Sequence, residues 1–235
     1  MRSEDRLRYL LHSESPEYKL ILRQTKKYIS EMLKICKNPY VAFSGGKDST
    51  VLLHLVSSQK SDIWVRHWDY GPWLLPRWIE TEILDNLSTI APEIKLDYQM
   101  RPGGDKESAR HSNVHASGFF VELEKAIKLR GWDMCFLGIR SKESRKRRQK
   151  VERSKSRGWD VNLGRACYPV GSWSATDIWS YIISNQLPYP TIYDKLARLY
   201  GYDNTRLSTF FDDEIAHIGS LEISNLLLWR DKKVE

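Results

Sequence analysis

Six consecutive residues early in the sequence have the types and spacing of a phosphate-binding loop, called the glycine loop below. They are Ser44, Gly45, Gly46, Lys47, Asp48 and Ser49. Two adjacent glycines let backbone N–H groups converge on an anion without obstruction by Cβ atoms. The lysine adds a full charge, the serines add hydroxyl donors, and a helix starting here would add its partial positive charge. The hexapeptide is not a Walker A loop, because Val41 stands where that motif has its first glycine.

An arginine and an aspartate further along the chain are placed to act on the same anion. Arg140 follows the predicted strand 133–138, and α/β sheets bind ligands beyond the carboxyl ends of their strands. A guanidinium there grips phosphate or sulfate with paired donors. Asp69 ends another predicted strand, where it either accepts from ribose hydroxyls, helps to hold Mg²⁺, or closes a turn. We expect Lys47, Asp48 and Arg140 to be catalytic, and Asp48 and Asp69 to hold Mg²⁺ if the bound anion is a polyphosphate that carries this ion.

The elements that must hold these residues follow from the hydrophobic pattern, in which short apolar runs alternate with helical periodicities. Strands are expected at 39–43, 63–68, 94–100, 133–138 and 166–170, and helices at 18–36, 48–55, 77–90, 119–130 and from 173 onward. Strands that alternate with helices form a parallel sheet covered on both faces. The expected fold class is α/β, Rossmann-like, with a parallel five-stranded sheet, helices on both faces and a C-terminal helical extension.

The composition limits the class of protein. Of 235 residues, 41% are hydrophobic and 29% are charged, which suits a folded chain with an ordinary core. No apolar run approaches about eighteen residues and residues 1–10 form no signal segment, so we expect a cytoplasmic chain without membrane association. The expected units are an N-terminal helical segment packed on the core (1–37), a nucleotide-binding α/β core (38–172) and a C-terminal helical lobe (173–235). A homo-oligomer is the expected assembly.

Four segments resemble the PP-loop (N-type ATP pyrophosphatase) superfamily and, within it, the sulfonucleotide (PAPS) reductase group. The glycine loop matches the family's SGGKDS motif. Residues 69–80 resemble the stretch after its second strand, 137–145 its Gly-(Ile/Leu)-Arg segment, and 169–193 its lobe after the fifth strand. The resemblance covers about residues 41–199 and implies an adenine nucleotide α-hydrolase type of fold. It implies that ATP or PAPS is bound by Ser44, Gly45, Gly46, Lys47, Asp48, Ser49, Asp69, Gly138, Arg140, Ser144 and Arg145.

The cysteines discriminate between the reactions of this family. A sulfonucleotide reductase of this type attacks sulfate sulfur with a cysteine near its C-terminus, whereas here Cys36, Cys135 and Cys167 are followed by none. Three scattered cysteines also cannot build a four-cysteine zinc site or iron–sulfur cluster, so neither is expected. The resemblance then implies an enzyme, in sulfur or nucleic-acid modification, that cleaves ATP at the α-phosphate and activates an acceptor as pyrophosphate leaves. A thiol-dependent PAPS or APS reductase is the alternative that the cysteines disfavour.

Positive charge is concentrated in one segment. Residues 140–157 contain ten Lys and Arg against two Glu, a net +8, while the whole chain carries +7. Such a run either contacts nucleic acid, forms a solvated face or lid, or places only its first arginines at the nucleotide. Within it, Glu143 either orients Arg140 or Arg145 or pairs with Arg147 on a helix.

Further contacts and partners follow from this segment and from the polar loop before residue 119. Candidate lid or polyanion contacts are His111, His115, Arg147 and Arg148. A non-catalytic nucleic-acid-binding module that uses residues 140–157 is a third interpretation of the chain. Besides an adenine nucleotide, the partners considered are a nucleic acid and a sulfur-donor protein.

Overall fold

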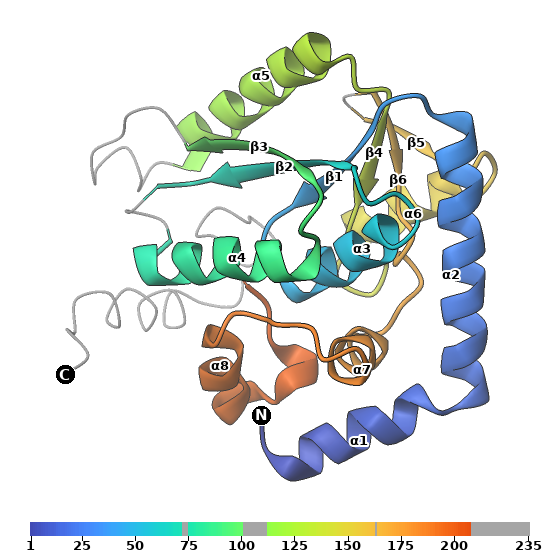
Figure 1. Cartoon of the computed structure of the whole chain (residues 1–235), viewed down its shortest axis with the longest axis vertical. Helices are drawn as coiled ribbons and strands as arrows, with labels where there is room; N and C mark the ends of the chain where they lie inside the picture. Colours follow the sequence, from blue (N-terminus) through green and yellow to red (C-terminus); the bar gives the residue numbers. More distant parts are fainter. Residues whose placement is uncertain (72–74, 101–111, 163, 208–235) are drawn as a thin grey trace.

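A six-stranded sheet forms the centre of the structure, a computed structural model that describes residues 1–71, 75–100, 112–162 and 164–207 (Figure 1). The strand order is β3-β2-β1-β4-β6-β5. The strands are β1 Pro39–Phe43, β2 Trp64–Asp69, β3 Lys95–Met100, β4 Met134–Leu137, β5 Asp160–Asn162 and β6 Gly164–Cys167. Neighbouring strands are parallel except β5 and β6, which are antiparallel. The expected α/β fold with a parallel sheet is confirmed.

The sheet differs from the expected five strands by one edge strand. β5 has three residues and pairs with β6. Val161 is its only apolar residue and is exposed, so no hydrophobic alternation distinguished this strand in the sequence. The five parallel strands are β1 to β4 and β6, and β6 begins two residues before the expected strand 166–170.

Helices cover both faces of the sheet, as expected (Figure 1). They are α1 Ser3–Ser13, α2 Pro16–Ile35, α3 Lys47–Ser57, α4 Arg77–Ile90, α5 Ser112–Arg130, α6 Arg145–Ser154, α7 Ala175–Ser184 and α8 Ile192–Tyr200, with a 3₁₀ turn at Tyr202–Asn204. Strand side chains alternate between faces, so β1 contributes to two cores. Val41 and Phe43 pack in the core that includes α3, α4 and α7, whereas Tyr40 packs in the core that includes α5 and α6.

Two N-terminal helices replace the single one expected at 18–36. Ser15 caps α2 by accepting a hydrogen bond from the Tyr18 amide at 3.2 Å, and Pro16 takes the first helical position. α1 packs against α7, where His12 Nε2 lies 2.7 Å from Asp177 Oδ1. No helix in the described part of the chain is long and apolar enough to cross a membrane. The division into units at residues 37 and 172 stays a prediction.

Candidate functional site

The backbone of the glycine loop requires a glycine at position 45. Gly45 has a φ of +73°, in the left-handed region, and a Cβ there would lie 2.5 Å from side-chain atoms of Ile83 on α4. Gly46 is the N-cap of α3. Gly138 follows β4, and a Cβ on it would lie 3.0 Å from the carbonyl oxygen of Asp48. The loop therefore fits tightly between α4 and the end of β4, at the N-terminus of α3, where a helix favours an anion.

Hydrogen bonds hold the shape of the glycine loop. Ser49 Oγ donates to the Gly46 carbonyl at 2.9 Å, and the Ser44 amide donates to Ser49 Oγ at 3.3 Å. The hydroxyl of Tyr193, on α8, accepts a hydrogen bond from the Lys47 amide at 2.9 Å. Because these groups are fixed by the fold, little reorganisation is needed when an anion binds.

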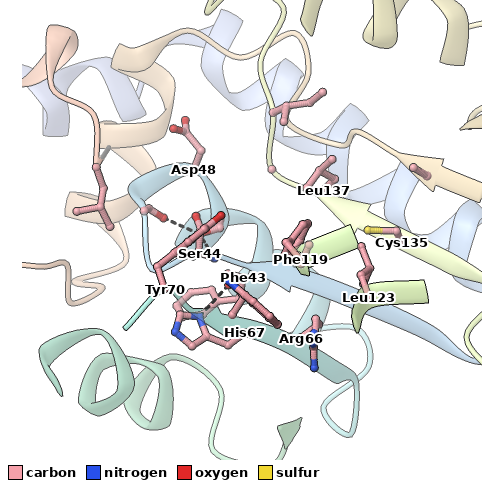
Figure 2. Close-up of a pocket in the computed structure, with 18 of the residues that line it drawn as sticks. Phe43, Ser44, Asp48, Arg66, His67, Tyr70, Phe119, Leu123, Cys135 and Leu137 are labelled. Atoms are coloured by element: carbon pink, nitrogen blue, oxygen red, sulfur yellow. Dashed lines mark hydrogen bonds between the residues drawn. The ribbon is translucent and has the colours of Figure 1, made fainter. Parts of the chain in front are cut away.

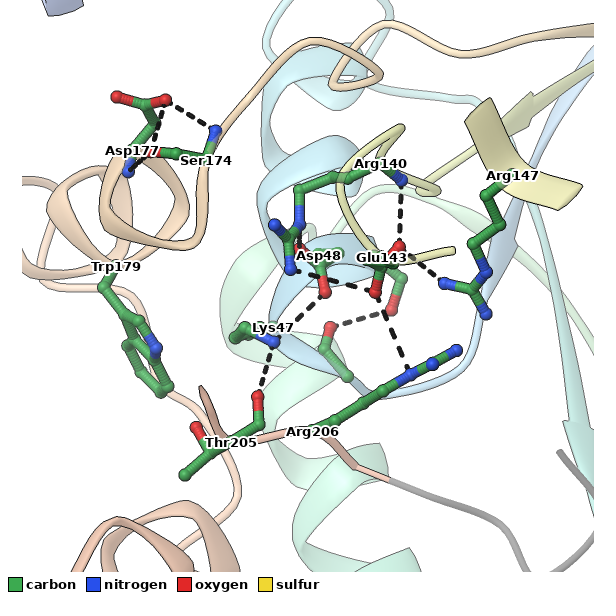
Figure 3. A network of polar contacts seen from close by, with 12 residues as sticks. Lys47, Asp48, Arg140, Glu143, Arg147, Ser174, Asp177, Trp179, Thr205 and Arg206 are labelled. Atoms are coloured by element: carbon green, nitrogen blue, oxygen red, sulfur yellow. Dashed lines mark hydrogen bonds and ion pairs between the residues drawn. The ribbon is translucent and has the colours of Figure 1, made fainter. Parts of the chain in front are cut away.

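A buried ion-pair network begins at the first two residues of α3 (Figure 3). The Lys47 side chain is 1% exposed, and its Nζ donates to the Thr205 carbonyl at 2.7 Å and lies 3.4 Å from Asp48 Oδ2. Asp48 Oδ1 accepts from Arg140 Nε at 2.5 Å. Burial lowers the pKa of Lys47; burial alone would raise the pKa of Asp48, but Lys47 and Arg140 lower it. The structure thus brings together the three residues that were predicted to be catalytic.

A second carboxylate, that of Glu143, contacts three arginines (Figure 3). Its Oε2 accepts from the Arg140 amide at 2.9 Å and from Arg147 Nη1 at 2.5 Å. Its Oε1 lies 3.8 Å from Arg140 Nη2 and 3.9 Å from Arg206 Nε. Glu143 therefore both orients Arg140 and pairs with Arg147. With Lys47, four cations surround two carboxylates, so the cluster carries a net +2 and favours an anion.

A cavity of about 390 Å³ lies beside this network (Figure 2). Asp48, Glu143, Arg147 and Arg206 line it, whereas Lys47 and Arg140 do not. Its polar end includes Ser44, Gly46, Asp48, Ser49, Gly138, Glu143, Arg147 and Arg206. Its apolar walls include Tyr40, Ala42, Phe43, Trp68, Phe119, Phe120, Leu123, Leu137 and Ile139. Small-molecule sites combine such an apolar enclosure with a few polar groups that fix orientation. The arrangement suits a ligand with an anionic tail at the glycine loop and an apolar body against the apolar walls.

Two buried side chains of β2 also line the cavity, and sequence reasoning identified neither. His67 Nδ1 lies 2.9 Å from the Phe43 carbonyl oxygen, and its Nε2 lies 2.6 Å from Glu80 Oε1. Both ring nitrogens of His67 thus face oxygen atoms, which fixes the orientation of the ring. Arg66 donates to Asp97 Oδ2 at 2.5 Å, and its Nε has no partner among the described residues. In the sequence both looked like ordinary strand residues.

Asp69 does not line this cavity. It is 0% exposed and accepts from Arg77 Nη1 and Nη2 at 2.9 and 2.8 Å, from the Tyr98 hydroxyl at 2.5 Å and from the Gly71 amide at 2.7 Å. Burial alone would raise its pKa, but the hydrogen bonds from Arg77 and Tyr98 lower it. Because both oxygens are engaged inside the protein, the placement favours the turn interpretation over ribose or Mg²⁺ binding.

The other predicted contact residues after β4 lie in two places, some at the cavity and some on the exposed surface of α6. Ser144 is the N-cap of α6 and accepts from the Arg147 amide at 3.2 Å. Arg147 lines the cavity, whereas Arg145 and Arg148 are exposed on α6. Arg147 rather than Arg145 is therefore placed to reach a ligand. His111 and the side chain of His115 lie outside the described residues.

The cysteines are free thiols with little nucleophilic character. Cys135 lines the cavity, and burial raises the pKa of Cys135 and of Cys36 to about 11. Burial raises the pKa of Cys167 well above its usual value. Reactive thiols have lowered pKa values, so none of the three resembles a catalytic thiolate. Within the described ranges, no three His, Cys, Asp or Glu side chains converge to hold a metal ion.

Comparison with known proteins identifies the family. Residues 38–207 match the family model of the phosphoadenosine phosphosulfate (PAPS) reductase domain. The chain belongs to this family. Sulfate adenylyltransferase subunit 2 of Rhizobium meliloti (strain 1021) is 26% identical over 196 residues, which cover 70% of this chain and 64% of that protein. Subunit 2 from Pseudomonas fluorescens (strain SBW25) is 27% identical over 221 residues, covering 80% and 70%. This chain thus spans less than two thirds of the length of the Rhizobium meliloti protein.

Two solved structures share the fold of this PAPS reductase domain. PAPS reductase from Candida auris, in a phosphate complex, has a TM-score of 0.55 at 18% identity and covers 77% of this chain and 92% of its own. The U34-tRNA thiolase NcsA from Methanococcus maripaludis, with its 4Fe–4S cluster, has a TM-score of 0.53 at 13% identity and covers 77% and 74%. At these identities the likeness shows the fold alone. The match of residues 38–207 to the PAPS reductase domain model confirms the predicted membership of the PP-loop superfamily.

Three groups at the site come from the end of the described chain. Tyr193 holds the glycine loop, Thr205 accepts from Lys47, and Arg206 reaches Glu143. Tyr193 lies in a segment that resembled the family, which was the only signal for it. Nothing in the sequence connected residues 205 and 206 with a loop about 160 residues earlier, because the contact arises from tertiary packing.

Proposed function

We propose that this chain is an ATP-dependent PP-loop enzyme that cleaves ATP at the α-phosphate, activates an acceptor and releases pyrophosphate. The observation that carries the proposal is the cluster of net charge +2 at the glycine loop, four of whose residues line an apolar-walled cavity. Membership of the PAPS reductase domain family supports an adenine nucleotide as ligand. The curated relatives named sulfate adenylyltransferase subunit 2 support ATP as that nucleotide.

The reaction is a substitution at phosphorus. An acceptor oxygen forms a bond to the α-phosphorus as the bond to the oxygen bridging toward the β-phosphate breaks, and pyrophosphate leaves with that electron pair. Lys47, Arg140 and the loop amides would neutralise the charge that develops on pyrophosphate. Glu143 would hold Arg140 and Arg147 in position, since it contacts both. The acceptor would be sulfate, a carboxylate or an amide-like carbonyl oxygen.

Magnesium would add charge neutralisation when ATP is bound, held chiefly by phosphate oxygens and water. Asp48 lies on the cavity wall at the glycine loop, and it would exchange its contacts with Arg140 and Lys47 for the metal. Asp69 does not line the cavity, and Arg77 and Tyr98 engage its oxygens. The raised pKa values of the thiols argue against the thiol-dependent reductase alternative.

Calorimetric titration with Mg·ATP tests the site. Lys47→Met removes the buried charge while keeping an unbranched side chain, and we expect ATP affinity to fall by about 10- to 100-fold, the range for a hydrogen bond to a charged group. Lys27→Met on α2 is the matched control, because Lys27 is exposed and distant from the loop in sequence. Equal affinities of wild type and Lys47→Met, with both folded by circular dichroism, would contradict the proposal.

A further inference from the structure

Helix α6 and the segment just before it present a strongly basic face to solvent. The exposed cations of this face, called the basic face below, are Lys142, Arg145, Lys146 and Arg148. Among the described residues none of the four makes an ion pair, whereas Arg153 pairs with Asp160 and Lys155 with Glu152. The basic face therefore carries about four uncompensated charges in water.

The helix geometry separates this face from the cavity. Val151 and Ser154 are buried, and Arg147 and Lys150 line the cavity. These four positions are three or four residues apart and so share one side of α6. Arg145, Lys146 and Arg148 fall outside that side. One helix thus directs cations both into the cavity and outward.

The chemistry of the basic face favours a nucleic acid over other polyanions. A protein interface needs apolar or aromatic anchors at its centre, and the outward positions of α6 are Arg, Lys, Gln and Glu only. A membrane-surface helix needs an exposed apolar face, but the apolar residue of α6, Val151, is buried in the protein. Nucleic acid backbones are bound mainly by Lys and Arg. A helix of ten residues is about 15 Å long and spans about four phosphates of one strand at about 3.4 Å each.

We propose that the basic face of α6 binds the phosphate backbone of a nucleic acid. The residues that carry this are Lys142, Arg145, Lys146 and Arg148, and the contact is with phosphates rather than bases. Arg147 and Lys150 on the same helix would place the bound strand beside the mouth of the nucleotide cavity. The inference goes beyond the proposed function and needs no ATP to be tested, so either can fail without the other.

Fluorescence anisotropy of the full chain with labelled 20-mers of single-stranded DNA, single-stranded RNA and duplex DNA tests the proposal. With about four phosphate contacts, log Kd should rise with log salt with a slope of about 2.8 for single strands and about 3.6 for duplex. Arg145→Gln combined with Arg148→Gln removes two contacts, so the slope should fall by about 1.4 to 1.8 and the affinity at low salt should drop. Lys47→Met should bind nucleic acid as wild type does.

The matched control is Arg23→Gln combined with Lys26→Gln, which removes two exposed charges from α2. This variant should bind like wild type, apart from a small effect of net charge. The proposal is overturned if none of the three nucleic acids binds in about 50 mM salt, or if both double variants weaken binding equally. It is also overturned if polyglutamate of similar charge binds as tightly, because that would indicate an acidic protein partner.

Discussion

Replacing Gly45 by alanine should destabilise the chain by about 2–5 kcal/mol. Two costs add: the left-handed backbone costs a non-glycine residue about 1–2 kcal/mol, and overpacking a buried site costs about 1–3 kcal/mol. Both costs apply at this position, because the φ of residue 45 is +73° and the new Cβ would lie 2.5 Å from the side chain of Ile83, which is fully buried. For a chain of this length the midpoint of thermal unfolding should fall by roughly 4–20 °C.

Gly131→Ala separates these costs. Gly131 has a φ of +67° but nothing lies within 4 Å of a Cβ there, so only the backbone cost of about 1–2 kcal/mol applies. Urea unfolding of both variants, and of Gly45→Ala combined with Ile83→Ala, measures the difference. Removing the Ile83 side chain should relieve the clash, so that the double variant is more stable than additivity predicts by about 1–3 kcal/mol. The reasoning would be refuted if Gly45→Ala and Gly131→Ala lowered the unfolding free energy equally. It would also be refuted if the effects of Gly45→Ala and Ile83→Ala on that free energy simply added in the double variant.

Three further predictions concern the site and its supports. Glu143→Gln leaves three guanidinium groups without their shared carboxylate and should cost about 3 kcal/mol in urea unfolding, against less than about 0.5 kcal/mol for the exposed Glu124→Gln. Added inorganic phosphate should recover stability in Glu143→Gln more than in wild type; an equal response would contradict the prediction that the anion takes the place of the lost carboxylate. Alkylation of Cys135, followed by mass spectrometry, should accelerate by about tenfold per pH unit up to pH 9.5, since its pKa is about 11; a plateau near pH 8 would contradict this. Asp177→Asn should lower the unfolding free energy at pH 7 by about 1–2 kcal/mol. The pKa of Asp177 is lowered in the folded protein, so its carboxylate stabilises the fold only while it is ionised. The difference between variant and wild type should therefore shrink as the pH falls below about 4. A difference that is the same at pH 7 and pH 3 would show that the charge of Asp177 contributes nothing.

The fold was predictable because local pattern and global architecture agree. The run at residues 39–43, the glycines after it and the apolar start of α3 all indicate a strand, a turn and a helix, and the structure has each of them. β5 was missed because three residues with one exposed apolar side chain carry no periodicity. The break between α1 and α2 depends on one cap and one proline, Ser15 and Pro16, which a long helical pattern can obscure.

The candidate site was only partly predictable. Lys47, Asp48 and Arg140 could be named because each follows or begins an element at the same edge of the sheet. The burial of Asp69 under Arg77 and Tyr98 could not be predicted, because it depends on which side of β2 the aspartate faces. The spacing within 140–148 also did not reveal that α6 begins at Arg145, which turns Arg147 inward and Arg145 outward.

The product of ATP cleavage tests the central claim most directly. The full chain would be incubated with Mg·ATP labelled at the α-phosphate, with sulfate, carboxylic acids and nucleic acid as acceptors in turn. The proposed function predicts pyrophosphate as the leaving product, with the α-label on AMP or on an adenylylated acceptor, and loss of this turnover in Lys47→Met. Release of ADP and inorganic phosphate, or pyrophosphate release that Lys47→Met does not reduce, would contradict it.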